Sequence, residues 1–272
     1  MPVINTGFKR TYYKEWKPDG PVKGTIILAH GLGATHNFYT ALLPHLLSLS
    51  HRCIAYDLSG CGQSPYVPIP QSLSSLSQDV ISLMDALDIR TATFVGHSMS
   101  GMTGPYLAAT FPDRINALAL CAPVYPTEAA GAVFADRIEK VGKGGMEGLA
   151  DVIPAMATGT TATGLQKAFV RELIGRNDPA AYISLCRVIA GAWEDVPKYE
   201  DVQCPVLIVA GKEDKNPSVD MCETILGRLG SQRKEIKILD GVGHWTCIEA
   251  PDEAGVAIGD FLGEVQKDLP RI

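Results

Sequence analysis

Gly96-His97-Ser98-Met99-Ser100-Gly101 is the stretch that decides the fold, because it joins a short apolar run to a segment of helical character. Small residues two positions before and after a serine allow a sharp turn that exposes the hydroxyl at a helix N-terminus. Ser100 stands where this pattern has a second glycine, and its small side chain still lets the helix approach the strand, though somewhat less closely. The stretch predicts a strand-to-helix corner with a nucleophilic Ser98; a chance Gly/Ser turn is the alternative.

On both sides of this corner, short β-branched runs alternate with segments of helical periodicity. The alternation predicts an α/β fold with a mostly parallel, doubly wound sheet. The predicted strands are 25–29, 52–56, 93–95, 117–121, 206–209 and 236–239. The clearest helix spans 73–87, where apolar residues recur at i, i+3, i+4 spacing and therefore face the sheet.

The alternation stops after the strand that ends near Cys121, for about eighty residues, far longer than a usual crossover loop. Residues 124–199 are interpreted as a helical cap inserted into a core domain of 1–123 and 200–272. Asp178-Pro179 predicts the start of one cap helix, with an N-cap followed by proline at the first helical position.

Such a cap is expected to cover the carboxyl ends of the strands, where open α/β sheets bind ligands, and to shape a mostly apolar pocket. The candidate substrate-binding residues are Tyr125, Trp193 and Trp245. Packing in the core is the favoured interpretation of Trp193, because it continues an apolar helix face that begins at Tyr182.

A nucleophilic serine needs a base and an acid that orients the base, which follow it in the chain in this type of fold. Only His244 among the six histidines lies downstream of Ser98. Asp214 follows the strand at 206–209 and is the candidate acid, with its neighbour Glu213 as the nearest rival. Asp57 precedes the nucleophile and is interpreted as a turn-forming residue.

Acyl transfer also needs donors for the oxyanion. The loop His30-Gly31-Leu32-Gly33 follows the first strong strand and could present the Leu32 backbone N–H beside that of Met99. His30 would then be a structural residue that holds the loop.

Composition narrows the class of protein. The 272 residues suit one large α/β domain or two small ones. A net charge of −6 without a basic stripe argues against nucleic-acid binding.

The seven cysteines are scattered and include no CxxC pair, which disfavours zinc and disulfides and favours a reducing compartment. No phosphate-binding glycine motif occurs. We therefore expect no cofactor, no metal and a small-molecule substrate; the sequence leaves the oligomeric state open.

The N-terminus is too polar for a signal peptide, and no apolar run reaches the roughly 18 residues of a membrane span. We expect a cytoplasmic protein without membrane contact. The C-terminal Pro270-Arg271-Ile272 distantly resembles a peroxisomal address, which is the alternative location.

Five motifs, HGLG (30–33), DLSGCGQS (57–64), GHSMSG (96–101), GKED (211–214) and GVGHW (241–245), together resemble the α/β-hydrolase superfamily in order and spacing. The resemblance covers nearly the whole chain except the cap. It is greatest to the esterase, enol-lactonase and C–C-bond hydrolase branch, which includes 3-oxoadipate enol-lactonase. Epoxide hydrolases and haloalkane dehalogenases carry aspartate at the position of Ser98, so those two activities are disfavoured.

The expected function is a cofactor-free serine hydrolase that cleaves a small ester, lactone or related carbonyl substrate through an acyl-enzyme on Ser98. A C–C hydrolase or an acyltransferase with the same triad is the first alternative. A non-catalytic ligand-binding protein on the same fold is the second, although such a protein need not keep nucleophile, base and acid together. A haloperoxidase-like activity is expected only as a side reaction.

Overall fold

The apolar runs form one eight-stranded sheet in the computed structural model, which describes residues 2–268. The strands are β1 (Val3–Thr6), β2 (Lys9–Trp16), β3 (Gly24–Ala29), β4 (His51–Tyr56), β5 (Ala92–His97), β6 (Ile115–Cys121), β7 (Val206–Gly211) and β8 (Lys234–Leu239). Their order across the sheet is β1-β2-β4-β3-β5-β6-β7-β8. Strands β3 to β8 run parallel, which confirms the predicted α/β fold. The C-terminal Pro270-Arg271-Ile272 lies outside the described residues.

The antiparallel strands β1 and β2 were not predicted from the sequence. They lie at one edge of the sheet and carry charged residues such as Lys9, Arg10 and Glu15 within the strand pattern. An antiparallel edge with one solvated face needs fewer apolar residues than a central parallel strand. Their sequence signal is therefore weak, whereas β5 is buried along its whole length.

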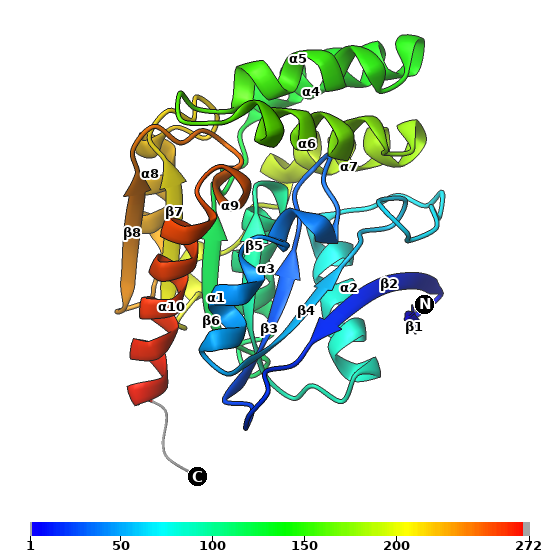
Figure 1. Ribbon diagram of the computed structural model, residues 1–272. Coiled ribbons are helices and arrows are strands. Elements are labelled where there is room, and N and C mark those ends of the chain that lie inside the picture. Colours follow the sequence, from blue (N-terminus) through cyan, green and yellow to red (C-terminus); the bar gives the residue numbers. More distant parts are fainter. Residues whose placement is uncertain (1, 269–272) are drawn as a thin grey trace.

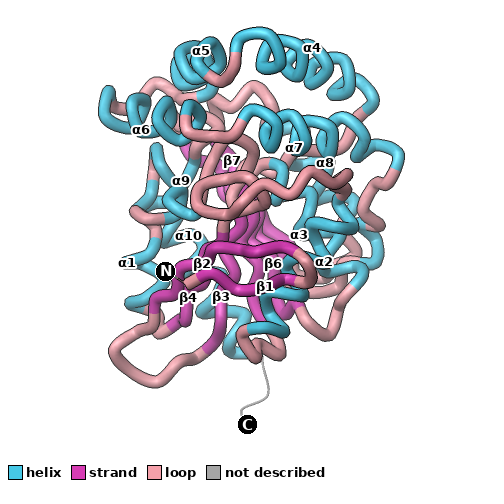
Figure 2. The backbone as a smooth tube through the Cα atoms, turned by 90° about the vertical axis from the view of Figure 1, so that its right-hand side faces the viewer, coloured by secondary structure: helices cyan, strands magenta, loops and turns pink. Residues whose placement is uncertain are grey.

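Helices cover both faces of the sheet (Figure 2). On one face, α1 (Leu43–Ser48) packs against α10 (Pro251–Asp268). On the other lie α2 (Leu73–Ala86), α3 (Met99–Thr110) and α8 (Val219–Arg228). The sequence pattern placed α2 to within one residue, because Ser72 caps its N-terminus and its apolar stripe is buried.

The segment between β6 and β7 contains helices and loops only. Its main helices are α4 (Glu128–Gly144), α5 (Glu147–Ala157), α6 (Gly164–Gly175) and α7 (Pro179–Gly191). Helix α4 packs against α7 and α5 against α6, and Figure 1 shows them as a layer above the carboxyl ends of the strands. Asp178 caps α7 by accepting a hydrogen bond from the Ala181 N–H. The division into a core domain and a cap domain stays a prediction.

Among residues 2–268, no helix combines the length and apolar character that crossing a bilayer requires.

Candidate active site

Ser98 lies at a strained corner between β5 and α3. Its φ of +55° falls in a region that costs a non-glycine residue about 1–3 kcal/mol, so the surrounding packing must hold it there. The flanking glycines permit that packing. A Cβ at Gly96 would lie 2.4 Å from the carbonyl oxygen of Ser100, and one at Gly101 would lie 2.6 Å from Cα of Pro123. The corner thus exists because small residues stand on both sides of the serine.

The side chains of Ser98, His244 and Asp214 form a continuous hydrogen-bond chain. The Ser98 hydroxyl lies 2.9 Å from Nε2 of His244, and Nδ1 of His244 lies 2.7 Å from Oδ2 of Asp214. With Nδ1–H donating to the carboxylate, Nε2 is free to accept the serine proton. These residues come from the ends of β5, β7 and β8, which parallel pairing brings to the same edge of the sheet.

Glu213, the rival acid, points elsewhere. Its exposed carboxylate accepts hydrogen bonds from the backbone N–H and the hydroxyl of Thr160, both at 2.7 Å. These bonds lower the pKa of Glu213 below its ordinary value. The geometry therefore favours Asp214 as the partner of His244.

Asp57 is buried and joins two loops, so its role extends beyond the single turn that the sequence indicated. Its carboxylate accepts hydrogen bonds from the His36 backbone N–H at 2.7 Å, from the His36 ring and from the Gln63 N–H at 2.9 Å. Burial raises the pKa of Asp57, but its interactions, above all the hydrogen bond with the His36 ring, outweigh burial and leave the pKa below its ordinary value. Asp57 stabilises the fold beside the site and makes no contact with His244.

The loop at His30-Gly31-Leu32-Gly33 lies directly against the serine corner. A Cβ at Gly31 would come within 2.7 Å of the Ser98 Cβ, so only glycine permits this approach. Within the described part of the chain, the backbone N–H groups of Leu32 and Met99 donate no hydrogen bond. Both predicted oxyanion donors are thus unpaired.

Two side chains hold this loop in place. Nε2 of His30 accepts a hydrogen bond from the Leu58 N–H, which puts the ring proton on Nδ1, and Nδ1–H donates to the Gly31 carbonyl. Burial lowers the pKa of His30, which favours this neutral form. The Ser100 hydroxyl donates to the His30 carbonyl at 2.7 Å. The residue that departs from the usual glycine thus ties the serine corner to the loop, a contact that the sequence analysis missed.

His97 is a second residue that sequence reasoning missed, because it occupies a variable position of the motif. Its Nε2–H donates to the His244 carbonyl at 3.0 Å, and its ring stacks on Phe38 with centroids 4.1 Å apart. Burial, together with the nearby His244, holds the pKa of His97 well below its ordinary value, so the ring is neutral. His97 therefore supports the backbone of His244.

The three candidate substrate-binding residues behave differently from one another. Trp193 lies in a 3-10 turn beyond the end of α7 and is 40% exposed, so the core-packing interpretation was wrong. Trp245 is only 2% exposed, and its ring packs beside the rings of His97 and His244. Tyr125 is half-buried; its ring stacks on Tyr199, and Arg228 lies over it.

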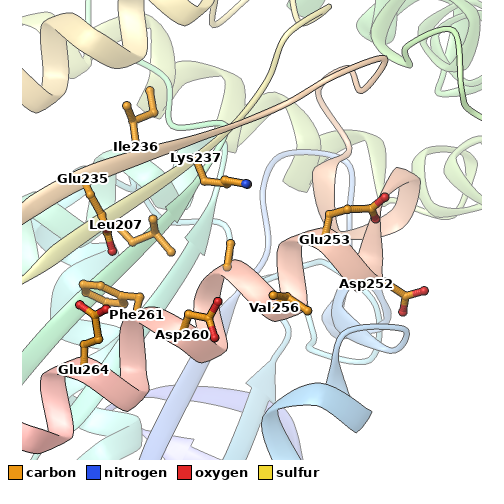
Figure 3. Close-up of a pocket in the computed structure, with 11 residues that line it drawn as sticks. Leu207, Glu235, Ile236, Lys237, Asp252, Glu253, Val256, Asp260, Phe261 and Glu264 are labelled. Atoms are coloured by element: carbon orange, nitrogen blue, oxygen red, sulfur yellow. The ribbon is translucent and has the colours of Figure 1, made fainter.

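Two sizeable cavities lie away from the triad. One, of about 550 Å³, lies between β8 and α10, and Figure 3 shows its lining, which includes Lys237 and acidic side chains such as Asp260 and Glu264. The other, of about 680 Å³, is mostly apolar and lies between Phe38 and Phe169 of α6. Among the described residues, neither cavity is lined by a member of the triad.

Comparisons with known proteins agree with this architecture. A family model described as "alpha/beta hydrolase fold" matches residues 24–143. Esterase YbfF of Escherichia coli (strain K12) is 28% identical over 247 residues, which cover 88% of this chain and 93% of the esterase. The enol-lactonase from Burkholderia xenovorans LB400 has a similar solved structure, with a TM-score of 0.86 and 26% identity; the match covers 96% of this chain and 100% of that one.

A further relative, 3-oxoadipate enol-lactonase 2 of Acinetobacter baylyi (strain ATCC 33305 / BD413 / ADP1), is 30% identical over 244 residues. That alignment covers 86% of both chains. These relatives are named as an esterase and as enol-lactonases, and the chain is accordingly an α/β-fold hydrolase. Since the likeness extends through both the sheet and the helical segment, the chain belongs to the α/β-hydrolase family.

Proposed function

We propose that this hydrolase is a cofactor-free serine enzyme that cleaves a small ester, lactone or related carbonyl substrate through an acyl-enzyme on Ser98. One observation carries the proposal: the hydrogen-bond chain of 2.9 and 2.7 Å that leads from Ser98 through His244 to Asp214. Nucleophilic acyl transfer requires this combination of a nucleophile, an adjacent base and a group that orients the base.

In the first step, Ser98 Oγ attacks the carbonyl carbon while Nε2 of His244 takes the hydroxyl proton. Asp214 holds the Nδ1–H tautomer and stabilises the imidazolium that forms. The bond between the carbonyl carbon and the leaving oxygen then breaks as His244 returns the proton to that oxygen. Water attacks the acyl carbon in the second half, with His244 again as base, which releases the acid and frees Ser98.

The tetrahedral intermediates of both halves carry a negative oxygen. We assign its binding to the backbone N–H groups of Leu32 and Met99, because both are unpaired and their loops are in contact at Gly31 and Ser98. A donor of this kind contributes about 2.7–4 kcal/mol to transition-state stabilisation, or about 10²- to 10³-fold in kcat.

The substrate class follows from the relatives and the chemistry of the site together. The relatives are named for an esterase and for enol-lactonases, and a further one is named a putative carbamate hydrolase. We propose ester or lactone cleavage, with specificity set by the helical segment 124–199 and with Tyr125 as a lining residue. We also propose a cytoplasmic location, which seven free cysteine thiols fit.

The test is a panel of esters, lactones, thioesters and carbamates of varied acyl size, assayed with wild type and Ser98→Ala. Wild type is expected to release a burst of leaving group equal to the enzyme concentration and to gain the acyl mass on Ser98. Ser98→Ala should fold normally and lose at least about a thousandfold in turnover. Residual activity above that level would refute the nucleophile assignment, and preferential transfer of the acyl group to an added alcohol would indicate an acyltransferase.

A further inference from the structure

The connection between α5 and α6 lies against both loops that carry the base and the acid. We call residues 157–161 the strap, and Figure 1 shows this connection above the carboxyl ends of β7 and β8. The backbone N–H of His244 donates to the carbonyl of Ala157 at 2.8 Å. The N–H and hydroxyl of Thr161 donate to the Gly241 carbonyl at 3.1 and 2.8 Å. The proposed base is therefore bonded to the helical segment through its own backbone.

The contact between strap and His244 loop leaves no room for side chains. A Cβ at Gly159 would lie 2.1 Å from the Gly241 carbonyl oxygen and 2.8 Å from the Gly243 nitrogen. A Cβ at Gly243 would lie 2.6 Å from the Gly159 nitrogen. Two backbones thus meet directly, and only glycine permits the approach from either side.

One buried carboxylate joins these two backbones. Glu249 is 7% exposed and accepts hydrogen bonds from the N–H groups of Gly159 at 2.6 Å, Gly243 at 2.9 Å and Trp245 at 2.9 Å. The last two donors belong to the residues on either side of His244. Burial raises the pKa of Glu249 above its ordinary value, and the three backbone N–H bonds only partly offset this shift.

We propose that Glu249 is a positioning residue, which couples the strap to the His244 loop and so sets the distance between His244 and Ser98. The inference rests on the proposed serine mechanism. With the Nε2–Oγ distance at 2.9 Å, small movements of the His244 loop matter, because a displacement of about 1 Å in an active site can cost about a hundredfold in rate.

Two substitutions test the coupling from opposite sides. Glu249→Gln keeps the shape of the side chain, but its NH₂ group replaces one carboxylate oxygen. It then faces at least one backbone N–H from which Glu249 now accepts a hydrogen bond. Gly159→Ala places a methyl group against Gly241 and pushes the strap away. Gly148→Ala is the matched control for the second change, because it makes the same substitution in α5, where a Cβ meets nothing within 4 Å.

Asp57→Asn is the matched control for the first, since Asp57 is also a buried carboxylate that accepts backbone N–H bonds but lies outside the His244 loop. Each protein is assayed on an activated ester, with active sites counted by the endpoint of labelling with a fluorophosphonate. We expect kcat per labelled site to fall about 10- to 100-fold in Glu249→Gln and Gly159→Ala, with KM changed less than about threefold. The labelling rate should fall by a similar factor, and both controls should stay within about twofold of wild type.

The double variant Glu249→Gln/Gly159→Ala adds a comparison of kcat values that general destabilisation of the fold does not affect. If both residues act through one contact, its kcat should be close to that of the worse single variant instead of the product of both effects. Either single variant decides the proposal if the other fails to fold. A lower Tm with unchanged kcat per site would overturn the inference while leaving the serine mechanism intact, whereas undiminished turnover in Ser98→Ala would overturn the mechanism itself.

Discussion

Replacing Asp214 by asparagine tests which carboxylate orients His244. Asp214 Oδ2 accepts Nδ1–H at 2.7 Å. An amide removes the negative charge and can turn its NH₂ toward Nδ1, which moves the ring proton to Nε2. That nitrogen then faces Ser98 with a proton already bound and no longer acts as a base.

The expected loss follows from two contributions. The attraction between a carboxylate and an imidazolium whose charges lie about 4 Å apart is worth about 4 kcal/mol at an effective dielectric constant near 20. That energy alone corresponds to a loss of nearly 10³ in kcat. The wrong tautomer adds about another factor of ten, so Asp214→Asn should lose about 10⁴ in kcat, as comparable triads do.

The assay is steady-state hydrolysis of an activated ester, normalised to folded protein by circular dichroism. Glu213→Gln is the neighbouring control and should keep kcat within about threefold, because the Glu213 carboxylate accepts its hydrogen bonds from Thr160 and not from His244. Asp57→Asn controls for loss of a buried carboxylate: it should lower stability by about 1–3 kcal/mol without a comparable loss of kcat. If Glu213→Gln were the more damaging change, the acid would have to be reassigned to Glu213.

Three further outcomes are expected. Ser100→Ala removes the hydrogen bond from the Ser100 hydroxyl to the His30 carbonyl. Because this bond positions the oxyanion loop, kcat should fall about three- to tenfold, and unchanged kinetics would refute that role. Replacing residues 124–199 by a Gly/Ser linker should bring the ratio of kcat/KM between the best panel substrate and a small activated ester close to one. Hydrolysis of both substrates should also slow, because the strap is lost. Retained selectivity would mean that other loops determine the specificity. Burial holds the pKa values of His30 and His97 below the ordinary value, so the unfolded chain binds more protons below about pH 6.5. The free energy of unfolding should therefore fall as pH drops below that value, by up to about 1.4 kcal/mol per pH unit for each histidine; urea denaturation between pH 7.5 and 5 measures this, and a flat profile would contradict it.

The sequence by itself was sufficient for the parts of the protein that local chemistry specifies. The corner at Ser98 follows from small residues at fixed spacing, and those residues are there because the backbone cannot turn so sharply otherwise. His244 could be chosen because no other histidine follows Ser98 in the sequence. Asp214 could be chosen because it follows a parallel strand, and such strands end at one edge of the sheet whatever their separation in the chain. The central strands could be predicted because burial on both faces of the sheet requires an unbroken apolar run.

The tertiary structure decided everything that depends on which surface a segment meets. Trp193 continues the apolar period of its helix in the sequence, yet α7 ends at Gly191 and the ring is exposed, because periodicity does not show where a helix stops. The hydrogen bonds that join Ser100 to His30 and Glu249 to Gly159 had no recognised signal in the sequence, because these backbone partners lie 70 and 90 residues away. Every residue except proline carries the same backbone N–H and C=O groups, so a contact to them does not constrain the partner's residue type, and only the folded chain reveals it.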